Sequence, residues 1–247
     1  MKREVKIPMP DGEARAFVFT PADGKGPWPA VIFYMDAPGL RPALYDMGER
    51  LAAAGYYVLM PDFFWRAGAY ENVNVAKLRQ GDPDQIALFG KLRASTGPEK
   101  QEKDARAYLD WLSKQPEAKA DKIGTTGYCM GGGIALRTAG VLGGHVAAAA
   151  SFHGGGMATD EPGSPHTYAP KIKAKVLVAG ADQDAHYDEA QNERLKKALK
   201  DADVDAEVSI WKGCLHGWVP ADMPVHNPEG AERHWRELLK LFDEALK

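Results

Sequence analysis

Residues 122–136 read KIGTTGYCMGGGIAL, and this stretch predicts how the chain folds around it. Its first part, up to Gly127, is short and apolar like a buried strand, and its second part, from Gly133 onward, is typical of a helix. The turn between them has the pattern Gly127-x-Cys129-x-Gly131, which matches the sharp corner that exposes a nucleophile at a sheet edge. Glycines suit the two flanks because larger side chains there would collide with the strand or the helix. The free amides and positive dipole end of a helix N-terminus would also favour a thiolate.

Two other interpretations of this corner stay open when it is considered without the rest of the chain. Small residues could pack there around a buried and inert thiol. The glycines could also form a phosphate-binding loop, although the lysine and hydroxyl residue of a P-loop and the GxGxxG of a dinucleotide site are both missing. A base and an acid at suitable positions further along the chain would favour the nucleophile.

An acid and a histidine do follow the cysteine, in the order that enzymes with this kind of corner use. Asp182 and Asp184 come directly after one predicted strand, and His216 lies in a glycine-bounded loop after the next one. Asp184 is favoured over Asp182, which we expect to cap its turn. We therefore predict a catalytic triad in which Cys129 is the nucleophile, His216 the base and Asp184 the group that orients the base.

Short apolar runs alternate with amphipathic segments along the chain, a pattern typical of a mostly parallel sheet covered by helices on both faces. The runs expected to form strands are 30–35, 56–61, 122–127, 146–152, 174–180 and 206–211. The segments expected to form helices are 42–54, 98–114, 130–141, 188–199 and 227–247. Two further strands around Asp11-Gly12 are predicted to pair as an antiparallel hairpin at the N-terminal edge. The fold class is therefore α/β, with residues 1–247 in a single domain.

Residues 62–95 interrupt this alternation with an excursion longer than a simple connection requires. Long excursions in compact domains often serve as functional covers. We expect this one to cover the active site or to add a pair of surface helices, and the two interpretations are compatible.

Composition and charge argue against several classes of partner. A formal net charge of −3 offers no basic face to nucleic acid or anionic lipid. The N-terminal sequence lacks the apolar run of a signal peptide, and no stretch approaches the roughly 18 apolar residues of a membrane span. Two cysteines provide no disulfide framework, so the reducing cytoplasm is the expected location. No metal is expected, because the CxxC, HExxH and EF-hand patterns are missing.

Together these motifs resemble those of the dienelactone hydrolase family, whose members have the α/β-hydrolase fold. The resemblance covers nearly the whole chain, and its marks are YMDAPG at 34–39, GY at 55–56, MPD at 60–62, GYCMGG at 127–132, ADQD at 181–184 and GCLHG at 213–217. The cysteine corner is the most specific mark, because most relatives with this fold carry serine there. The resemblance implies hydrolysis of a small-molecule ester or lactone through a thioester intermediate, without a cofactor.

The resemblance also implies roles for three residues beside the triad. The backbone amides of Ala37 and Met130 would form an oxyanion hole. Asp36 stands where the family has an acidic residue, usually glutamate, that contacts the resting thiol and helps to gate its ionisation. A carboxylate near Cys129 would disfavour the thiolate, but the aspartate side chain is one methylene shorter. The alternative role for Asp36 is that of a turn cap.

The substrate pocket is expected over the C-terminal ends of the strands. Its expected lining residues are Phe63, Phe64, Trp65, Arg66, His153 and Trp218. In the family's best-known members two arginines bind the carboxylate of a dienelactone, and one of those places holds Pro220 here. Candidates for the other are Arg66, Arg79 and Arg93. The expected substrate is therefore a related but less anionic ester or lactone.

Two rival functions stay open on the sequence. One is a thiol-dependent acyl transferase or another nucleophilic-cysteine enzyme on the same fold, and the other is a non-enzymatic thiol sensor. A sensor would need neither His216 nor Asp184, which favours the enzyme. The oligomeric state and the natural substrate are not predicted.

Overall fold

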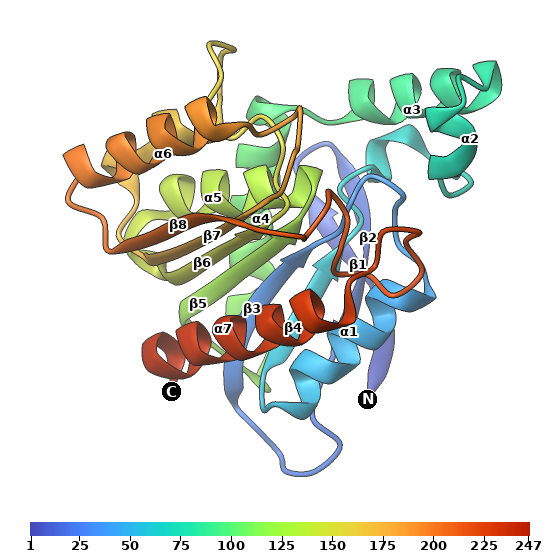
Figure 1. Ribbon diagram of the computed structural model, residues 1–247. Helices are drawn as coiled ribbons and strands as arrows, with labels where there is room; N and C mark the ends of the chain where they lie inside the picture. Colours follow the sequence, from blue (N-terminus) through green and yellow to red (C-terminus); the bar gives the residue numbers. More distant parts are fainter.

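The computed structural model describes residues 1–247, except for the side chain of Arg79. Eight strands of the described chain form one sheet, in the order β1-β2-β4-β3-β5-β6-β7-β8 (Figure 1). Their bounds are β1 (Lys2–Met9), β2 (Gly12–Phe19), β3 (Trp28–Tyr34), β4 (Tyr57–Pro61), β5 (Ala118–Tyr128), β6 (Val146–Phe152), β7 (Lys175–Ala181) and β8 (Ala206–Trp211). β2 is antiparallel to both β1 and β4, and every other neighbouring pair is parallel. The predicted parallel sheet with an antiparallel hairpin at its N-terminal edge is confirmed.

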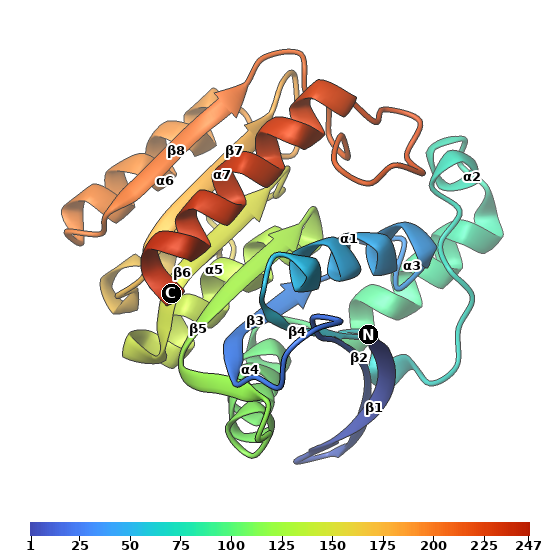
Figure 2. The ribbon, with the colours of Figure 1, turned by 90° about the horizontal axis from the view of Figure 1, so that it is seen from below.

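Helices cover both faces of this sheet, as Figure 1 and Figure 2 show. The α-helices are α1 (Pro42–Ala53), α2 (Val75–Arg79), α3 (Pro83–Ser95), α4 (Pro98–Ser113), α5 (Met130–Leu142), α6 (Glu189–Asp201) and α7 (Pro228–Leu246), and the 3-10 helices are η1 (Trp65–Ala67), η2 (Gly143–His145) and η3 (Pro165–Lys171). α1 and α7 lie on one face, and α4, α5 and α6 lie on the other. None of the helices in the described part of the chain is both long enough and apolar enough to cross a membrane.

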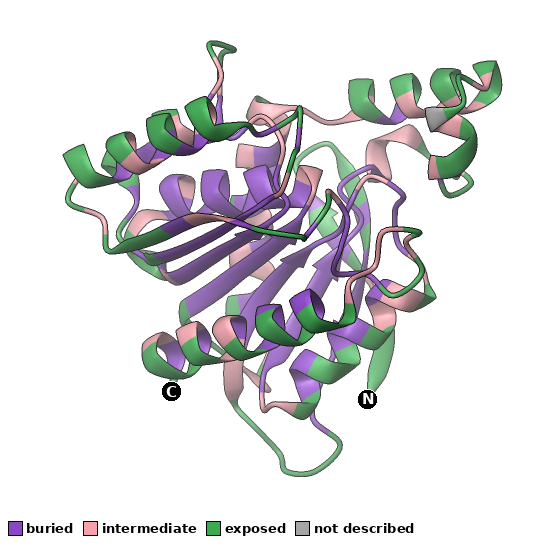
Figure 3. Cartoon of the chain, viewed as in Figure 1, coloured by how far each residue is buried: buried purple, intermediate pink, exposed green. Residues whose placement is uncertain are grey.

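The core lies on both faces of the central strands, which Figure 3 shows as buried along almost their whole length. All five residues of β4 are buried, and so are the last five of β3. Burial on both faces explains why these strands read as nearly continuous apolar runs. Four of the α-helices begin at a proline, which fits the first helical turn because no backbone donor is needed there.

β5 begins four residues earlier than the sequence predicts. Its first residues, from Ala118 to Lys122, are exposed or half-buried, so they carry no apolar run. They join the sheet because Ala118 and Lys119 lie beside Trp28 and Pro29 of β3. Backbone pairing at the sheet margin, and not side-chain burial, thus sets this end of the strand.

The excursion at residues 62–95 consists of η1, α2 and α3. Its helices α2 and α3 are mostly exposed and project beyond the sheet (Figure 1, Figure 3). The segment before them instead lies on the loop after β3: the Val73 amide donates to the Pro38 carbonyl at 3.3 Å, and the Asn72 side chain donates to the Leu40 carbonyl at 2.8 Å. The predicted surface helices are present, and a covering role remains a prediction.

Candidate active site

The C-terminal ends of the parallel strands lie side by side at one edge of the sheet. Tyr34 at the end of β3 is in register with Gly127 near the end of β5, and Ala181 at the end of β7 is in register with Trp211 at the end of β8. The loops that follow these strands therefore begin at the same edge. This edge receives the residues predicted for catalysis, which are Asp36, Ala37, Cys129, Met130, Asp184 and His216.

Cys129 occupies a strained corner between β5 and α5. Its backbone angles are φ 53° and ψ −119°, a region that residues with a side chain rarely adopt. A Cβ atom on Gly127 would collide with the backbone of Gly131, and one on Gly131 would collide with the Met35 carbonyl oxygen. The two flanking glycines are thus required by the close approach of strand, corner and helix, as the sequence predicts. The corner holds a partly exposed free thiol at the N-terminus of α5.

His216 and Asp184 form a short hydrogen bond at the same edge. Nδ1 of His216 lies 2.6 Å from Oδ2 of Asp184, and Oδ1 of Asp184 accepts from the His186 amide at 2.9 Å. Burial tends to raise the pKa of Asp184, but the His216 ring and the His186 amide hold it below its ordinary value. Asp184 is therefore an anion that fixes the orientation of the ring.

The His216 ring is placed to take up a proton from the thiol. Burial tends to lower its pKa, but the bond to Asp184 and the neighbouring Cys129 outweigh burial and raise the pKa to about 10. The negative charge of Asp184 is one reason why the protonated ring is favoured. The structure therefore brings together the three side chains that the sequence proposes from distant parts of the chain.

His153 supports the corner from behind and does not face open solvent. Its side chain is fully buried, its φ is 42°, and its Nδ1 accepts from the Cys129 amide at 3.0 Å. Burial and the nearby His216 hold the pKa of His153 well below its ordinary value, so the ring is neutral. Trp218, also fully buried, has its ring 5.0 Å from that of His153. Both residues lie beside the triad, but they are buried and neither is exposed to solvent.

Two backbone amides near the thiol have no protein acceptor within the described chain. Met130 is the first residue of α5, and Ala37 lies in a turn that the Gly39 amide closes on the Asp36 carbonyl at 3.1 Å. Among the hydrogen bonds of the described residues, neither the Met130 amide nor the Ala37 amide is a donor. Both remain candidates for an oxyanion hole, which stays a prediction.

Asp36 has a partner that the sequence analysis missed. Both of its carboxylate oxygens bind the Arg41 guanidinium, at 2.5 and 2.9 Å, and the same guanidinium binds Asp222 at 2.6 and 3.1 Å. Burial raises the pKa of the Asp36 carboxyl, and the Arg41 charge opposes that rise. Because Arg41 occupies both oxygens, the structure does not place this carboxylate on Cys129, and thiol gating stays a prediction. Asp222 lies 186 positions along the chain from Asp36, so no sequence pattern links them.

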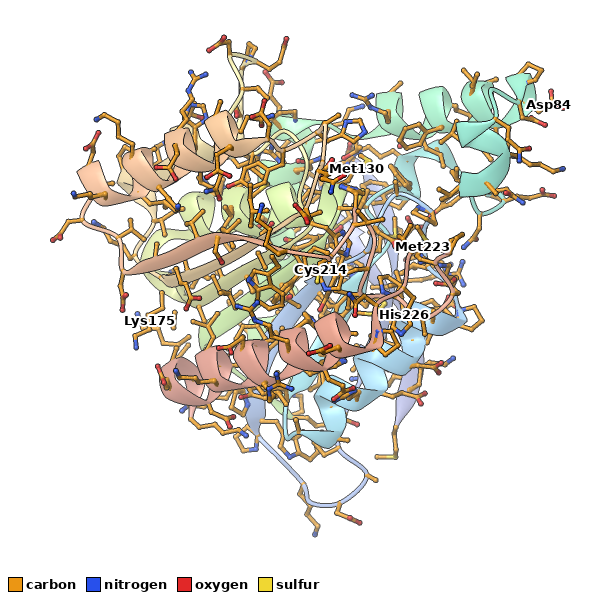
Figure 4. All side chains as sticks on the ribbon, in the orientation of Figure 1. Asp84, Met130, Lys175, Cys214, Met223 and His226 are labelled. Carbon is orange, nitrogen blue, oxygen red and sulfur yellow. The ribbon has the colours of Figure 1, made fainter. Side chains whose placement is uncertain are left out.

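The aromatic residues at the start of the excursion that were predicted to line the pocket pack into the core and against the β1–β2 turn. Phe63 and Phe64 are 1% and 0% exposed, so both belong to the core. Trp65 packs against Gly12 in the β1–β2 turn, where a Cβ atom would clash with the indole ring. Figure 4 shows Asp84, in the first turn of α3, far from Met130 at the corner. Phe63 and Phe64 thus contribute to the core, and a role for these residues in the pocket stays a prediction.

The arginines considered as substrate ligands have other positions. Arg66 binds Asp104 at 2.7 and 2.8 Å and Asp11 at 2.6 and 2.9 Å. Arg93 is an exposed residue of α3. The Arg79 side chain lies outside the described residues.

The sheet, the strained strand-to-helix corner and the paired acid and histidine after later strands define an α/β-hydrolase. Comparison with known proteins then gives the family. The model of the dienelactone hydrolase family matches residues 14–246. The chain belongs to the dienelactone hydrolase family and is a hydrolase, as the resemblance of its motifs implies.

Curated relatives and a solved structure agree with this assignment. A "Putative carboxymethylenebutenolidase" of Synechocystis sp. is 27% identical over 226 residues, which are 90% of this chain and 88% of the relative. A protein of the same name from Methylorubrum extorquens is 28% identical over 97% of this chain and 79% of its own length. The crystal structure of a "Putative Dienelactone Hydrolase" from Klebsiella pneumoniae has a TM-score of 0.83 and 24% identity, over 98% of each chain, and supports the fold.

Proposed function

We propose that the protein hydrolyses a carboxylic ester or lactone with Cys129, His216 and Asp184, through a thioester intermediate. The Cys129 sulfur attacks the carbonyl carbon while its proton passes to His216. The alcohol then leaves with that proton, and the acyl group stays on the sulfur. Water attacks the thioester next, again giving a proton to His216. The C–S bond then breaks, the carboxylic acid is released, and the Cys129 sulfur takes the proton back from His216. The amides of Met130 and Ala37 would stabilise the oxyanion, and such a donor is typically worth about 3 kcal/mol of barrier.

The placement of His216 is the observation that carries this proposal. The ring binds Asp184 on one side and lies beside Cys129 on the other, and the two together raise its pKa to about 10. A ring with a high proton affinity next to a thiol favours the ion pair that attacks a carbonyl. A thiol sensor gains nothing from such an arrangement.

Release of 4-nitrophenol from 4-nitrophenyl acetate tests the proposal. We expect turnover by the wild-type protein, and a mass gain of one acetyl group when the reaction is quenched early. Cys129→Ala should abolish both signals, whereas Cys214→Ala, which removes the other free and buried thiol, should retain them. Acetylation of Cys129 without turnover would contradict hydrolysis and support a sensor. Transfer of the acetyl group to an added alcohol in preference to water would support a transferase.

A further inference from the structure

One guanidinium joins the two loops that flank the candidate nucleophile. Arg41 follows the loop after β3 that carries Asp36, and Asp222 lies in the segment between His216 and α7. The side chains of Arg41 and Asp36 are 10% and 3% exposed, whereas that of Asp222 is 43% exposed. The inner edge of the guanidinium is therefore held in the core, and Asp222 occupies the outer edge, which faces solvent.

Arg41 is bound to the loop after β3 that carries Asp36 and Ala37, through the Asp36 carboxylate and the Gly39 carbonyl oxygen. Its positive charge is one cause of the low pKa of His153, the residue that accepts from the Cys129 amide. With two carboxylates on one guanidinium, this group carries a net charge of −1. At the same edge the charge of Asp184 is offset by the protonated His216 ring, so the triad does not cancel this negative charge. A substrate with its own carboxylate would approach a negative site and would have to displace Asp222 to reach the cation.

Arg66, the other cation considered as a substrate ligand, is occupied in the same way. Asp104 and Asp11 each bind its guanidinium through two bonds, and its side chain is 10% exposed. Two arginines that could recognise a carboxylate are thus both committed to pairs of acidic side chains. The chemistry of these contacts favours acyl groups that bring no negative charge.

We propose that Asp222 is a specificity-determining residue, which fits the site to uncharged esters and lactones by occupying the outer edge of Arg41. The inference rests on the proposed ester hydrolysis and adds the substrate class to it. Asp222 acts through Arg41 and touches no reacting atom. Removal of its charge should expose a cation to the substrate and reverse the selection against anionic acyl groups.

Two 4-nitrophenyl esters of adipic acid test this inference, one with a free terminal carboxylate and one with a terminal carboxamide of the same shape. The wild-type protein should prefer the carboxamide in kcat/KM, after spontaneous hydrolysis is subtracted. Asp222→Asn should shift the carboxylate-to-carboxamide ratio of kcat/KM upward by about tenfold. The ratio is informative because a general loss of activity in the variant would affect both esters alike.

Salt gives a second readout that a merely structural role would not change. Raising the ionic strength from about 0.02 M to about 0.5 M shortens the screening length several-fold. Salt should increase kcat/KM for the carboxylate ester in the wild-type protein, where repulsion is screened. In Asp222→Asn this increase should be largely lost, because Arg41 and Asp36 then form a neutral pair and little repulsion is left to screen.

Glu244→Gln is the matched control, since it also removes one exposed carboxylate from an ion pair, with Lys175 at 3.1 Å. Figure 4 shows Lys175 far from Met130 and Met223. An unchanged ratio in this control, with the shift in Asp222→Asn, supports the inference. A wild-type preference for the carboxylate ester, or an equal shift in both variants, overturns it while ester hydrolysis stands. If neither ester releases 4-nitrophenol, the proposed hydrolysis fails and the inference falls with it.

Discussion

Asp184→Asn is the substitution that tests the triad most directly. Asparagine keeps the shape of the side chain, and its oxygen can still accept from the His186 amide, so its NH2 group turns toward Nδ1 of His216. Nδ1 must then accept, and the ring proton moves to Nε2, the nitrogen that has to take the proton from Cys129.

The size of the effect follows from the charge that the ring carries. The rise in the pKa of His216 from 6.5 to about 10 corresponds to about 5 kcal/mol in favour of the imidazolium, shared between Asp184 and Cys129. Loss of the share that Asp184 supplies, together with the wrong tautomer, should lower kcat/KM by about 10³-fold to 10⁴-fold, or about 4 to 5.5 kcal/mol.

Initial rates of 4-nitrophenyl acetate hydrolysis measure this loss. Asp182→Asn is the control, because Asp182 is the neighbouring acid, and its carboxylate accepts from the Gly213 amide at 2.9 Å and pairs with Lys212 at 3.6 Å. We expect the control to stay within about threefold of the wild-type protein, with thermal unfolding showing that both variants fold. More than about one-tenth of wild-type activity in Asp184→Asn, or a larger loss in Asp182→Asn, would refute this reasoning.

Two further predictions concern the packing of the corner and the proton that His216 carries. Gly127→Ala should destabilise the fold by about 3 kcal/mol or more in urea unfolding, because the added methyl group meets the backbone of Gly131. Gly90→Ala, in α3 with open space around it, should instead stabilise by about 0.5 to 1 kcal/mol; equal effects of the two would contradict the packing described. His216 keeps its proton up to about pH 10 in the folded protein, as its raised pKa shows, but only to about pH 6.5 when unfolded. The contribution of this proton to the free energy of unfolding should therefore be complete below about pH 6.5 and should be lost as the pH rises toward 10. Cys129→Ala should narrow this pH range, because the ring then loses one of the two residues that raise its pKa. A free energy of unfolding that increases across the range would be inconsistent with the ion pair.

The fold could be predicted because its strands carry their own signal. β6 and β8 have the predicted bounds. Residues 146–152 are an apolar run, residues 206–211 place two polar side chains between apolar ones, and polar residues flank both segments. The start of β5 could not be predicted, because Ala118 and Lys119 pair at the sheet margin without forming an apolar run.

The triad could be proposed from the sequence for a similar reason. Each of its residues follows a predictable strand, and parallel strands bring their ends to one edge. The ion pairs of Arg41 and Arg66 could not be found in this way, because their partners lie in unrelated loops and no periodic pattern marks them. The sequence around Phe63 and Phe64 has no periodic pattern that would distinguish a core side chain from the wall of a pocket. Their burial in the structure places them in the core.

The backbone sets the geometry of the corner, so the shape of the turn does not depend on the reactive atom that residue 129 carries. Gly127 and Gly131 fit against strand and helix whatever atom residue 129 carries, and the His153 bond reaches the amide of that residue, not its sulfur. An oxygen nucleophile could therefore replace the sulfur without rebuilding the turn. A lineage with this scaffold can exchange thiol for alcohol chemistry in one substitution, while the surrounding architecture stays as it is.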